Sequence, residues 1–321
     1  MFTVRRMTPS DKPAMMEIAS RIWEGNDYLP AVFDAWVADA SGEFVAVLLE
    51  GRLVGCGKLT FFTPADAWLE GLRKDPLVNV KGCARAVFEC FAAGLASRKG
   101  LASVRFSTYA LNPGSVGANE RLGFRRRTVL SLKAWAGTAE QLAVMPLRAE
   151  ERQRERVQTV LDEGMVFDFL DRTGYFTATE GLVVEGWRAL PFSRELFAAR
   201  YVRPGLCRGI VAGGQLEGLA VRALDPLLSR LMVRLVCLDA ADDAGAGALF
   251  DDTILAARSA ATRAGAEKCE IEWMLPDRAR LKAWSAVFGL QSWEQEDDFI
   301  VYELPIEALS APGAPGTGGT T

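Results

Sequence analysis

The sequence predicts an α/β protein in which a mixed, mostly antiparallel sheet flanked by helices occurs twice, with a degenerate second copy. The first observation is the length of 321 residues, since domains usually hold about 100–200 residues and this chain can form two. The second is the alternation of strand-like and helix-like hydrophobic patterns along the chain. The third is the order of these patterns, because the later part of the first half recurs in the second half.

The composition narrows the function. Lys and Arg total 37 against 41 Asp and Glu, giving a net charge of −4, so there is no basic surplus for phosphate backbones and nucleic acid is not an expected partner. Half of the residues are apolar and 24% are charged, which is typical of a globular protein with a large core. Histidine is absent, which excludes imidazole bases and histidine-based metal sites, and no metal is expected.

The cysteines and the N-terminus indicate the compartment. No two of the six cysteines form a C-x-x-C pair, and most lie in apolar stretches, so we expect reduced core residues. The N-terminal segment 1–12 carries charges where a signal peptide needs an apolar region, and the apolar run 231–238 is interrupted by Arg234. A soluble, cytoplasmic protein without membrane contact is therefore expected.

Residues 1–74 predict one strand, two helices and three strands. Residues 2–7 alternate like a strand, and Thr8-Pro9-Ser10-Asp11 supplies an N-cap, a proline at the first helical position and an acid for the first turn. Gly51 and Thr63-Pro64 separate three runs of strand composition, which indicates an antiparallel meander. These elements are expected at 2–7, 8–23, 30–39, 43–50, 52–62 and 67–74.

The next segment predicts a helix, a strand, a helix and a strand. Apolar residues recur at helical spacing between Gly82 and Lys99, and Gly100 stands where a C-terminal cap is needed. Pro113 fits the first turn of the second helix. These elements are expected at 82–99, 104–111, 113–122 and 124–135.

The second half predicts the same later order. Gly82 and Gly245 are 163 residues apart, and Leu122-Gly123-Phe124 and Phe288-Gly289-Leu290 are 166 apart, as in a duplicated fold with small loop changes. Chance pairing is the alternative, because the chain holds 30 glycines. The strands and helices are expected at 207–212, 216–222, 231–238, 249–264, 267–274, 277–288 and 299–304.

Two domains and a tail are therefore expected, an N-terminal domain at 1–140 and a C-terminal domain at 150–308. The charged stretch 148–156 is the expected connector. The tail 309–321 is rich in Gly, Pro, Ala and Thr and is expected to be disordered.

The stretch 70–84 runs from a strand through a turn into a helix N-terminus. Small residues there let backbone N–H groups approach a ligand, and the first turn of a helix favours a phosphate. Taken alone, the pattern also fits an ordinary tight turn.

The order of elements and motifs over residues 2–135 resembles the GNAT superfamily, the acyl-CoA-dependent N-acyltransferases. Pro76 and the pattern Asn79-x-x-Gly82-x-Ala84 stand where that family has its Val-x-Pro-like strand end and its pyrophosphate motif, and Asn112 precedes Gly123 of Leu122-Gly123-Phe124 by the family's spacing of 11.

This resemblance implies a tandem GNAT fold, acetyl-CoA as co-substrate, and acetyl transfer to the primary amine of a small molecule. A narrower similarity lies in Trp23 to Pro30 with Trp36, together with Glu70-Gly71-Leu72-Arg73. Both segments resemble the histidine N-acetyltransferase type, whose members acetylate the α-amino group of a free amino acid. The similarity implies an amino-acid-like acceptor, and not histidine in particular.

The resemblance also implies roles for single residues. Backbone amides after Glu70 would hold the thioester and pantetheine, and those at the start of the following helix would hold the pyrophosphate. The tyrosine that protonates the CoA thiolate in many members is here Asn119, so that proton donor is missing. The residues expected at the co-substrate are Leu72, Arg73, Lys74, Asn79, Val80, Lys81, Gly82, Cys83, Ala84, Asn112 and Ser115.

Glu70 is the candidate general base, because an ammonium must lose a proton before its nitrogen can attack a carbonyl. The period of two along a strand puts Glu70 on the same face as Trp68 and Leu72. A glutamate that only anchors the strand is the alternative.

The candidate acceptor pocket is formed by Asp27, Tyr28 and Trp68, with Trp23 and Trp36 beside them. Asp27 would bind a substrate ammonium, and Arg73 or Arg105 a carboxylate. The alternative is that these aromatic residues belong to the core.

Two other functions remain open. Asp242 and Asp243 lie where a pyrophosphate would bind in the second half, and their like charge argues against CoA and against catalysis there. Asn79, Val80 and Asn119 depart from the family pattern, and these departures favour a non-catalytic module that senses acyl-CoA or binds a protein. The sequence specifies neither the acceptor nor the acyl length nor the oligomeric state.

Overall fold

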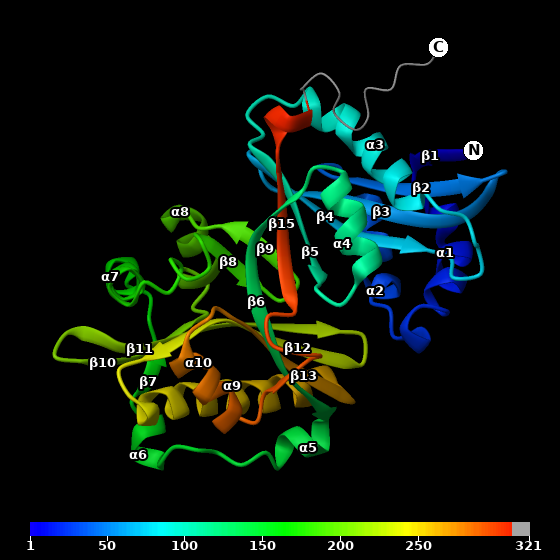
Figure 1. The fold of residues 1–321 in the computed structure, drawn as a ribbon. Coiled ribbons are helices and arrows are strands. Elements are labelled where there is room, and N and C mark those ends of the chain that lie inside the picture. Colours follow the sequence, from blue (N-terminus) through cyan, green and yellow to red (C-terminus); the bar gives the residue numbers. More distant parts are fainter. Residues whose placement is uncertain (310–321) are drawn as a thin grey trace. The chain divides into compact units, whose positions relative to one another are not determined.

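The computed structural model describes residues 1–309, and residues 310–321 of the expected disordered tail lie outside the described residues. The chain divides into two compact units (Figure 1). Of the described residues, the first unit contains Met1–Phe106, Gly114–Arg125 and residues 302–309. The second unit contains Ser107–Pro113 and Arg126–Val301.

The first unit is an antiparallel meander with helices on both faces. Strands β1 to β4 pair antiparallel in the order β1-β2-β3-β4, and β5 pairs parallel with β4. Gly71 lies against Trp36 of α2, and Gly57 lies against Val87 of α3, so helices cover the two faces of the sheet. The elements are β1 (Phe2–Arg6), α1 (Lys12–Ala19), α2 (Leu29–Ala38), β2 (Glu43–Leu49), β3 (Arg52–Thr63), β4 (Asp66–Lys74), α3 (Cys83–Ala96), β5 (Ser103–Tyr109) and α4 (Pro113–Arg121).

One expected helix ends early. The start at Thr8 is confirmed, because the backbone N–H of Thr8 donates to Asp11 Oδ2 at 2.8 Å in a capping box. The helix stops at Ala19 rather than at Trp23. Trp23 and Glu24 have φ values of 46° and 56°, and such left-handed residues do not continue a helix.

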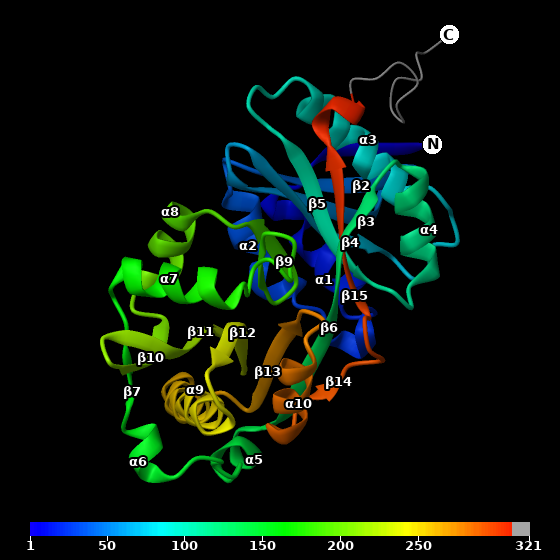
Figure 2. The ribbon, with the colours of Figure 1, turned by 60° about the vertical axis from the view of Figure 1, so that its left-hand side comes forward.

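The second unit has the same order of pairing. Strands β10, β11 and β12 form an antiparallel meander, β13 pairs parallel with β12, and β7 adds to the β10 edge. The helix α9 lies between β12 and β13 in the chain (Figure 2). The elements are β6 (Arg125–Thr138), α5 (Ala139–Ala143), α6 (Glu151–Arg154), β7 (Val157–Thr159), α7 (Glu163–Thr173), β8 (Leu182–Glu185), β9 (Arg188–Pro191), α8 (Arg194–Phe197), β10 (Cys207–Ala212), β11 (Gln215–Leu227), β12 (Arg230–Ala240), α9 (Asp243–Ala264), β13 (Lys268–Leu275), α10 (Ala279–Val287), β14 (Gln291–Ser292) and β15 (Phe299–Pro305).

The repeat predicted from the sequence is present in the fold. Gly123 follows α4 with φ of 89°, and Gly289 follows α10 with φ of 78°, so the two glycines close equivalent helices. The other marker pair is wrong in detail. Gly82 is the N-cap of α3, whereas Gly245 lies inside α9, which begins at Asp243 rather than at 249. The residue equivalent to Gly82 is the N-cap Asp242.

The two halves exchange their closing strands. β6, the last strand of the first half, pairs antiparallel with β13 of the second unit, with Thr138 opposite Lys268. Residues from Tyr302 onward in β15 belong to the first unit, where the Tyr302 ring stacks on Phe106 at 5.2 Å. The units therefore do not follow the continuous ranges 1–140 and 150–308.

Two features concern the predicted reduced cysteines and the predicted lack of membrane contact. All six cysteines have free thiols, and all except Cys90 are buried. Among residues 1–309, no helix combines the length and the apolar composition needed to cross a membrane.

Candidate functional site

The turn after β4 is fixed by a buried carboxylate. Asp75 donates its backbone N–H to Val54 O at 2.8 Å, and its side chain accepts hydrogen bonds from Arg21 and Arg52 at 3.1–3.3 Å. It also accepts from the backbone N–H of Leu77 at 3.1 Å. The chain therefore leaves β4 in a defined direction, and the predicted residues Asn79, Val80, Lys81 and Gly82 that follow are exposed.

The N-terminus of α3 has free hydrogen-bond donors. Its N-cap, Gly82, makes no side-chain cap, and its first turn contains no acid. The first N–H groups of a helix have no partner inside the helix, so those of Cys83 and Ala84 point outward with the positive end of the helix dipole. The φ of 102° at Gly82 favours glycine. These features fit the anion site that the sequence predicts here.

The equivalent helix start in the second unit is closed by its own side chains. The N-cap Asp242 accepts a hydrogen bond from the backbone N–H of Gly245 at 2.7 Å. Asp243 accepts from Trp284 Nε1 at 2.7 Å. The two carboxylates occupy the region where an anion would bind, so α3 and α9 differ in charge at the same position of the repeat.

Strand β4 contains a bulge next to the candidate base. Cys56 pairs with Arg73 and Lys58 pairs with Glu70, so Gly71 and Leu72 together face a single residue of β3. A bulge leaves backbone groups outside the ladder, which is what binding of a thioester through backbone amides needs. It also corrects the predicted face, because paired residues share a face. Arg73, and not Leu72, shares the face of Glu70 and Trp68.

Glu70 is held from the neighbouring strand. Thr60 Oγ1 donates to Glu70 Oε1 at 2.6 Å. Lys58, directly opposite on β3, is buried and binds Asp39 and the carbonyl oxygen of Leu59. Glu70 is half-buried, so its carboxylate is oriented and still accessible, as a general base must be.

The residues predicted to bind an ammonium and a carboxylate bind each other. Arg73 donates two hydrogen bonds to Asp27, at 2.8 and 2.9 Å, and their side chains are 9% and 1% exposed. Burial opposes the charge of Arg73, but the hydrogen bonds to Asp27 outweigh it and raise the pKa of the guanidinium. Arg105 is likewise paired with Asp66 and Glu303. A ligand would have to displace these ion pairs.

The predicted aromatic residues divide between core and surface. Trp68 is buried and lies 6.1 Å from the Phe62 ring, and Trp36 is buried against Phe44 at 5.3 Å. Trp23 is exposed and covers the Arg73 guanidinium at 4.4 Å, while Tyr28 contacts it at 5.0 Å. Trp23 and Tyr28 thus pack around the Asp27–Arg73 pair.

The remaining predicted residues lie in α4 or directly before it. Asn112 ends the turn after β5, with its backbone N–H bound to Tyr109 O at 3.2 Å, and it is exposed. Asn119 Nδ2 donates to the carbonyl oxygen of Ser115 at 2.7 Å and to its Oγ at 3.1 Å. The Asn119 amide therefore bonds its own helix, and it supplies no replacement for the family's tyrosine.

A buried acid in the second unit was not predicted from the sequence. Glu272 of β13 is 4% exposed, and its Oε1 accepts a hydrogen bond from Trp187 Nε1 at 3.3 Å. Among the described residues, its Oε2 has no hydrogen-bond partner, and Arg234 Nε is 4.0 Å away. Burial and the charge of Glu270 raise the pKa of Glu272 to about 7. The only signal in the sequence is the alternation Glu270-Ile271-Glu272 within a strand.

This raised pKa predicts a loss of stability at high pH. The unfolded chain releases the Glu272 proton near its ordinary pKa of 4.5, so between pH 4.5 and about 7 the folded state binds more protons and stability falls as pH rises. We expect the free energy of unfolding of Glu272→Gln, relative to that of the parent, to be higher at pH 8 than at pH 4 by about 3 kcal/mol. Urea unfolding at both pH values measures this. Equal differences at the two pH values would contradict it, and the exposed Glu217→Gln serves as control.

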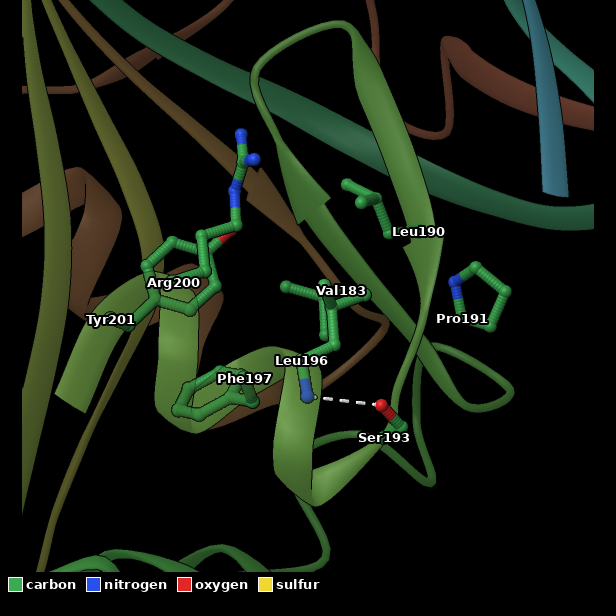
Figure 3. Close-up of a pocket in the computed structure, with 8 residues that line it drawn as sticks. All are labelled: Val183, Leu190, Pro191, Ser193, Leu196, Phe197, Arg200 and Tyr201. Atoms are coloured by element: carbon green, nitrogen blue, oxygen red, sulfur yellow. Dashed lines mark hydrogen bonds between the residues drawn. The ribbon is translucent and has the colours of Figure 1, made fainter. Parts of the chain in front are cut away.

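Two small pockets in the second unit contain none of the predicted site residues. Figure 3 shows one beside α8 with a volume of about 10 Å³, which admits at most one water. Ser193 in its wall caps the helix by accepting from the Leu196 N–H. Another, of about 160 Å³, lies beside α5 and α9, where Arg258 binds the carbonyl oxygens of Leu142 and Met145. Both are smaller than usual ligand pockets.

Comparison with known proteins agrees with this geometry. Residues 12–124 match the sequence profile of the Acetyltransferase (GNAT) family. Comparison with curated protein sequences gives no match.

Solved structures resemble nearly the whole chain. A GCN5-related N-acetyltransferase from Sphaerobacter thermophilus is 15% identical with a TM-score of 0.63, over 95% of this chain and 96% of that one. A tandem GNAT protein from the clavulanic acid biosynthesis pathway is 14% identical with a TM-score of 0.57, over 98% and 100%. A glucosamine N-acetyltransferase region in a fungal multi-domain β-N-acetylglucosaminidase is 11% identical with a TM-score of 0.56, over 95% and 38%. At these identities the likeness shows the fold. Residues 12–124 are thus similar to the GNAT acetyltransferase family, and the chain as a whole has an α/β fold like that of solved tandem GNAT proteins.

Proposed function

We propose that the protein transfers an acetyl group from acetyl-CoA to the primary amine of a small molecule, and that the first unit does the chemistry. The observation that carries this proposal is the uncapped N-terminus of α3, inside the segment that matches the family. The equivalent end of α9 is filled by Asp242 and Asp243. The protein is proposed to act in the cytoplasm, with neither nucleic acid nor membrane as partner.

The co-substrate is proposed to lie between the β4 bulge and α3. The amides of Lys81, Gly82, Cys83 and Ala84 would bind the pyrophosphate, helped by the dipole of a helix of 14 residues. The exposed side chains of Leu72, Leu77 and Val80 line the same stretch of chain, and their apolar surface suits pantetheine. No long side chain is available at Asn79, which supports backbone rather than side-chain recognition.

The reaction follows from general acyl-transfer chemistry. Glu70 takes a proton from the acceptor ammonium, and the free amine nitrogen attacks the thioester carbonyl carbon. The backbone amides beside the bulge stabilise the oxygen that becomes negative. The new C–N bond replaces the C–S bond, and the nitrogen releases its second proton to solvent to become an amide. CoA leaves as a thiolate that takes a proton from solvent, since a thiol pKa of about 8.5 makes it a tolerable leaving group even without the tyrosine that Asn119 replaces. Holding amine and thioester together supplies much of the acceleration.

A calorimetric titration with acetyl-CoA followed by an assay of CoA release with a panel of small amines tests this function. We expect one site per chain and release of thiol that depends on the amine. Binding without release on the whole panel would favour the acyl-CoA sensor, which the self-bonded amide of Asn119 supports. No binding at all would overturn both.

A further inference from the structure

A row of aromatic rings in the second unit leads from the surface to the buried Glu272. The Tyr109 ring lies 4.5 Å from Trp187 and, nearly parallel, 6.5 Å from Trp293. Trp293 is 48% exposed, whereas Tyr109 and Trp187 are half-buried. Ser107 Oγ donates to the carbonyl oxygen of Trp187 at 2.7 Å and fixes the turn that carries this tryptophan.

Negative charge surrounds these rings. Burial and the nearby carboxylates of Glu272, Glu294, Asp298 and Glu270 raise the pKa of Tyr109, so its phenol keeps its proton. The nearest cation at Glu272 is Arg234, which is itself bound to Asp225 at 2.7 Å. Asp298 is already occupied, because it accepts hydrogen bonds from the backbone N–H groups of Leu132 and Glu294. The other carboxylates that act on Tyr109 are Glu270, Glu272 and Glu294, and Glu270 also feels the charges of Arg230 and Arg234.

The unsatisfied Oε2 of Glu272 determines which ligand the aromatic rings and the carboxylates could bind. A buried carboxylate oxygen without a donor is costly, and here Oε2 is left so, even though Oε1 is bound by Trp187. Gly186 and the Arg234 side chain lie beside it, because a Cβ on Gly186 would be 3.2 Å from Oε2 and 2.6 Å from Arg234 Nε. The missing partner is an N–H donor with positive charge. Aromatic faces favour an organic cation over a strongly hydrated metal ion.

We infer that Glu272, Tyr109, Trp187 and Trp293 form a binding site for an organic ammonium ion that carries N–H groups and an apolar body, and that lacks a carboxylate. The aromatic faces bind the body, and Glu272 Oε2 accepts the hydrogen bond. A ligand carboxylate is disfavoured because Glu270 and Glu294 would repel it. All of these residues belong to the second unit, so this site goes beyond the acetyl transfer proposed for the first.

Calorimetry with 2-phenylethylammonium chloride tests the site and needs no turnover. We expect it to bind at least tenfold tighter than 2-phenylethanol, which lacks the charge, than N,N,N-trimethyl-2-phenylethylammonium, which lacks the N–H donors, and than phenylalanine, which adds a carboxylate. Glu272→Gln and Trp293→Leu should each weaken binding at least tenfold. Glu217→Gln, an exposed glutamate of the same unit paired with Arg156, should leave it unchanged.

The inference is overturned if the ammonium compound binds no tighter than the alcohol, or if the variants bind it as the parent does. Trp293→Leu keeps the test valid should Glu272→Gln misfold, because Trp293 is a surface residue. The assay of CoA release shows whether the bound ammonium ion is the acetyl acceptor or a separate ligand. A rise in KM for the amine in the Trp293→Leu variant marks the bound ion as the acetyl acceptor, and an unchanged KM marks it as a separate ligand. Failure of acetyl transfer leaves the calorimetric result intact, so the two proposals fail separately.

Discussion

Glu70→Gln is expected to lower kcat for acetyl transfer about 1000-fold while leaving the Kd of acetyl-CoA within twofold. General base catalysis contributes about 10²–10⁴-fold, and glutamine keeps the shape and the hydrogen bond from Thr60 but cannot take a proton. The variant should regain rate as pH rises toward the pKa of the acceptor amine, about 10 for a primary alkylamine, because more of the amine is then already deprotonated.

Steady-state kinetics over a pH series, with calorimetry for acetyl-CoA, measures both effects. The matched control is Glu89→Gln, an acid on α3 that pairs with Arg85 one turn away. An unchanged kcat would reassign Glu70 to anchoring the strand. A joint loss of kcat and acetyl-CoA binding would assign it to co-substrate binding instead.

Gly82→Glu is expected to raise the Kd of acetyl-CoA at least 100-fold, equivalent to about 2.7 kcal/mol. The introduced carboxylate would lie at the N-terminus of α3 and satisfy its free N–H groups, as Asp242 does for α9. It would therefore compete with the pyrophosphate for the same donors and repel its charge.

Gly100→Glu is the control. Gly100 lies beyond the other end of α3, its φ of 81° is also positive, and a Cβ there meets nothing within 4 Å. Both variants thus add one negative charge and similar backbone strain to the same unit. Calorimetric titration of the two should differ by the full 100-fold. Similar affinities would show that α3 does not hold the pyrophosphate.

The sequence was sufficient for the strands and helices of the two repeated meanders, because hydrophobic periods and helix-ending glycines are local signals. The elements between residues 157 and 197 (β7, α7, β8, β9 and α8) were not predicted. Gly123 and Gly289 have the positive φ that the repeat requires, and Gly82 caps the helix it was expected to precede. The bulge at Gly71 and Leu72 was not predictable, because an extra residue on one strand leaves the period of two intact on either side. It moved Arg73 onto the face of Glu70.

Pairs of side chains that lie far apart in the sequence could not be predicted from it either. Asp27 and Arg73 were both identified, but as separate ligands for a substrate rather than as partners. The cluster at Glu272 was missed because its members come from four separate segments, with Tyr109 at the end of β5, Trp187 in a hairpin turn, Glu272 in a central strand and Trp293 just after β14. Only the fold brings these segments together.

The exchange of closing strands also sets the order in which the chain can complete its structure during synthesis. The ring of Phe106 packs on Phe124 and on Tyr302, yet the ribosome makes Tyr302 roughly 180 residues after Phe124. At about 5–20 residues per second, roughly 10–35 s pass before the first unit receives its last strand. During that time one side of β5 lacks its neighbour, and an open strand edge invites pairing with another chain. The first unit is therefore complete only after Tyr302 has emerged from the ribosome.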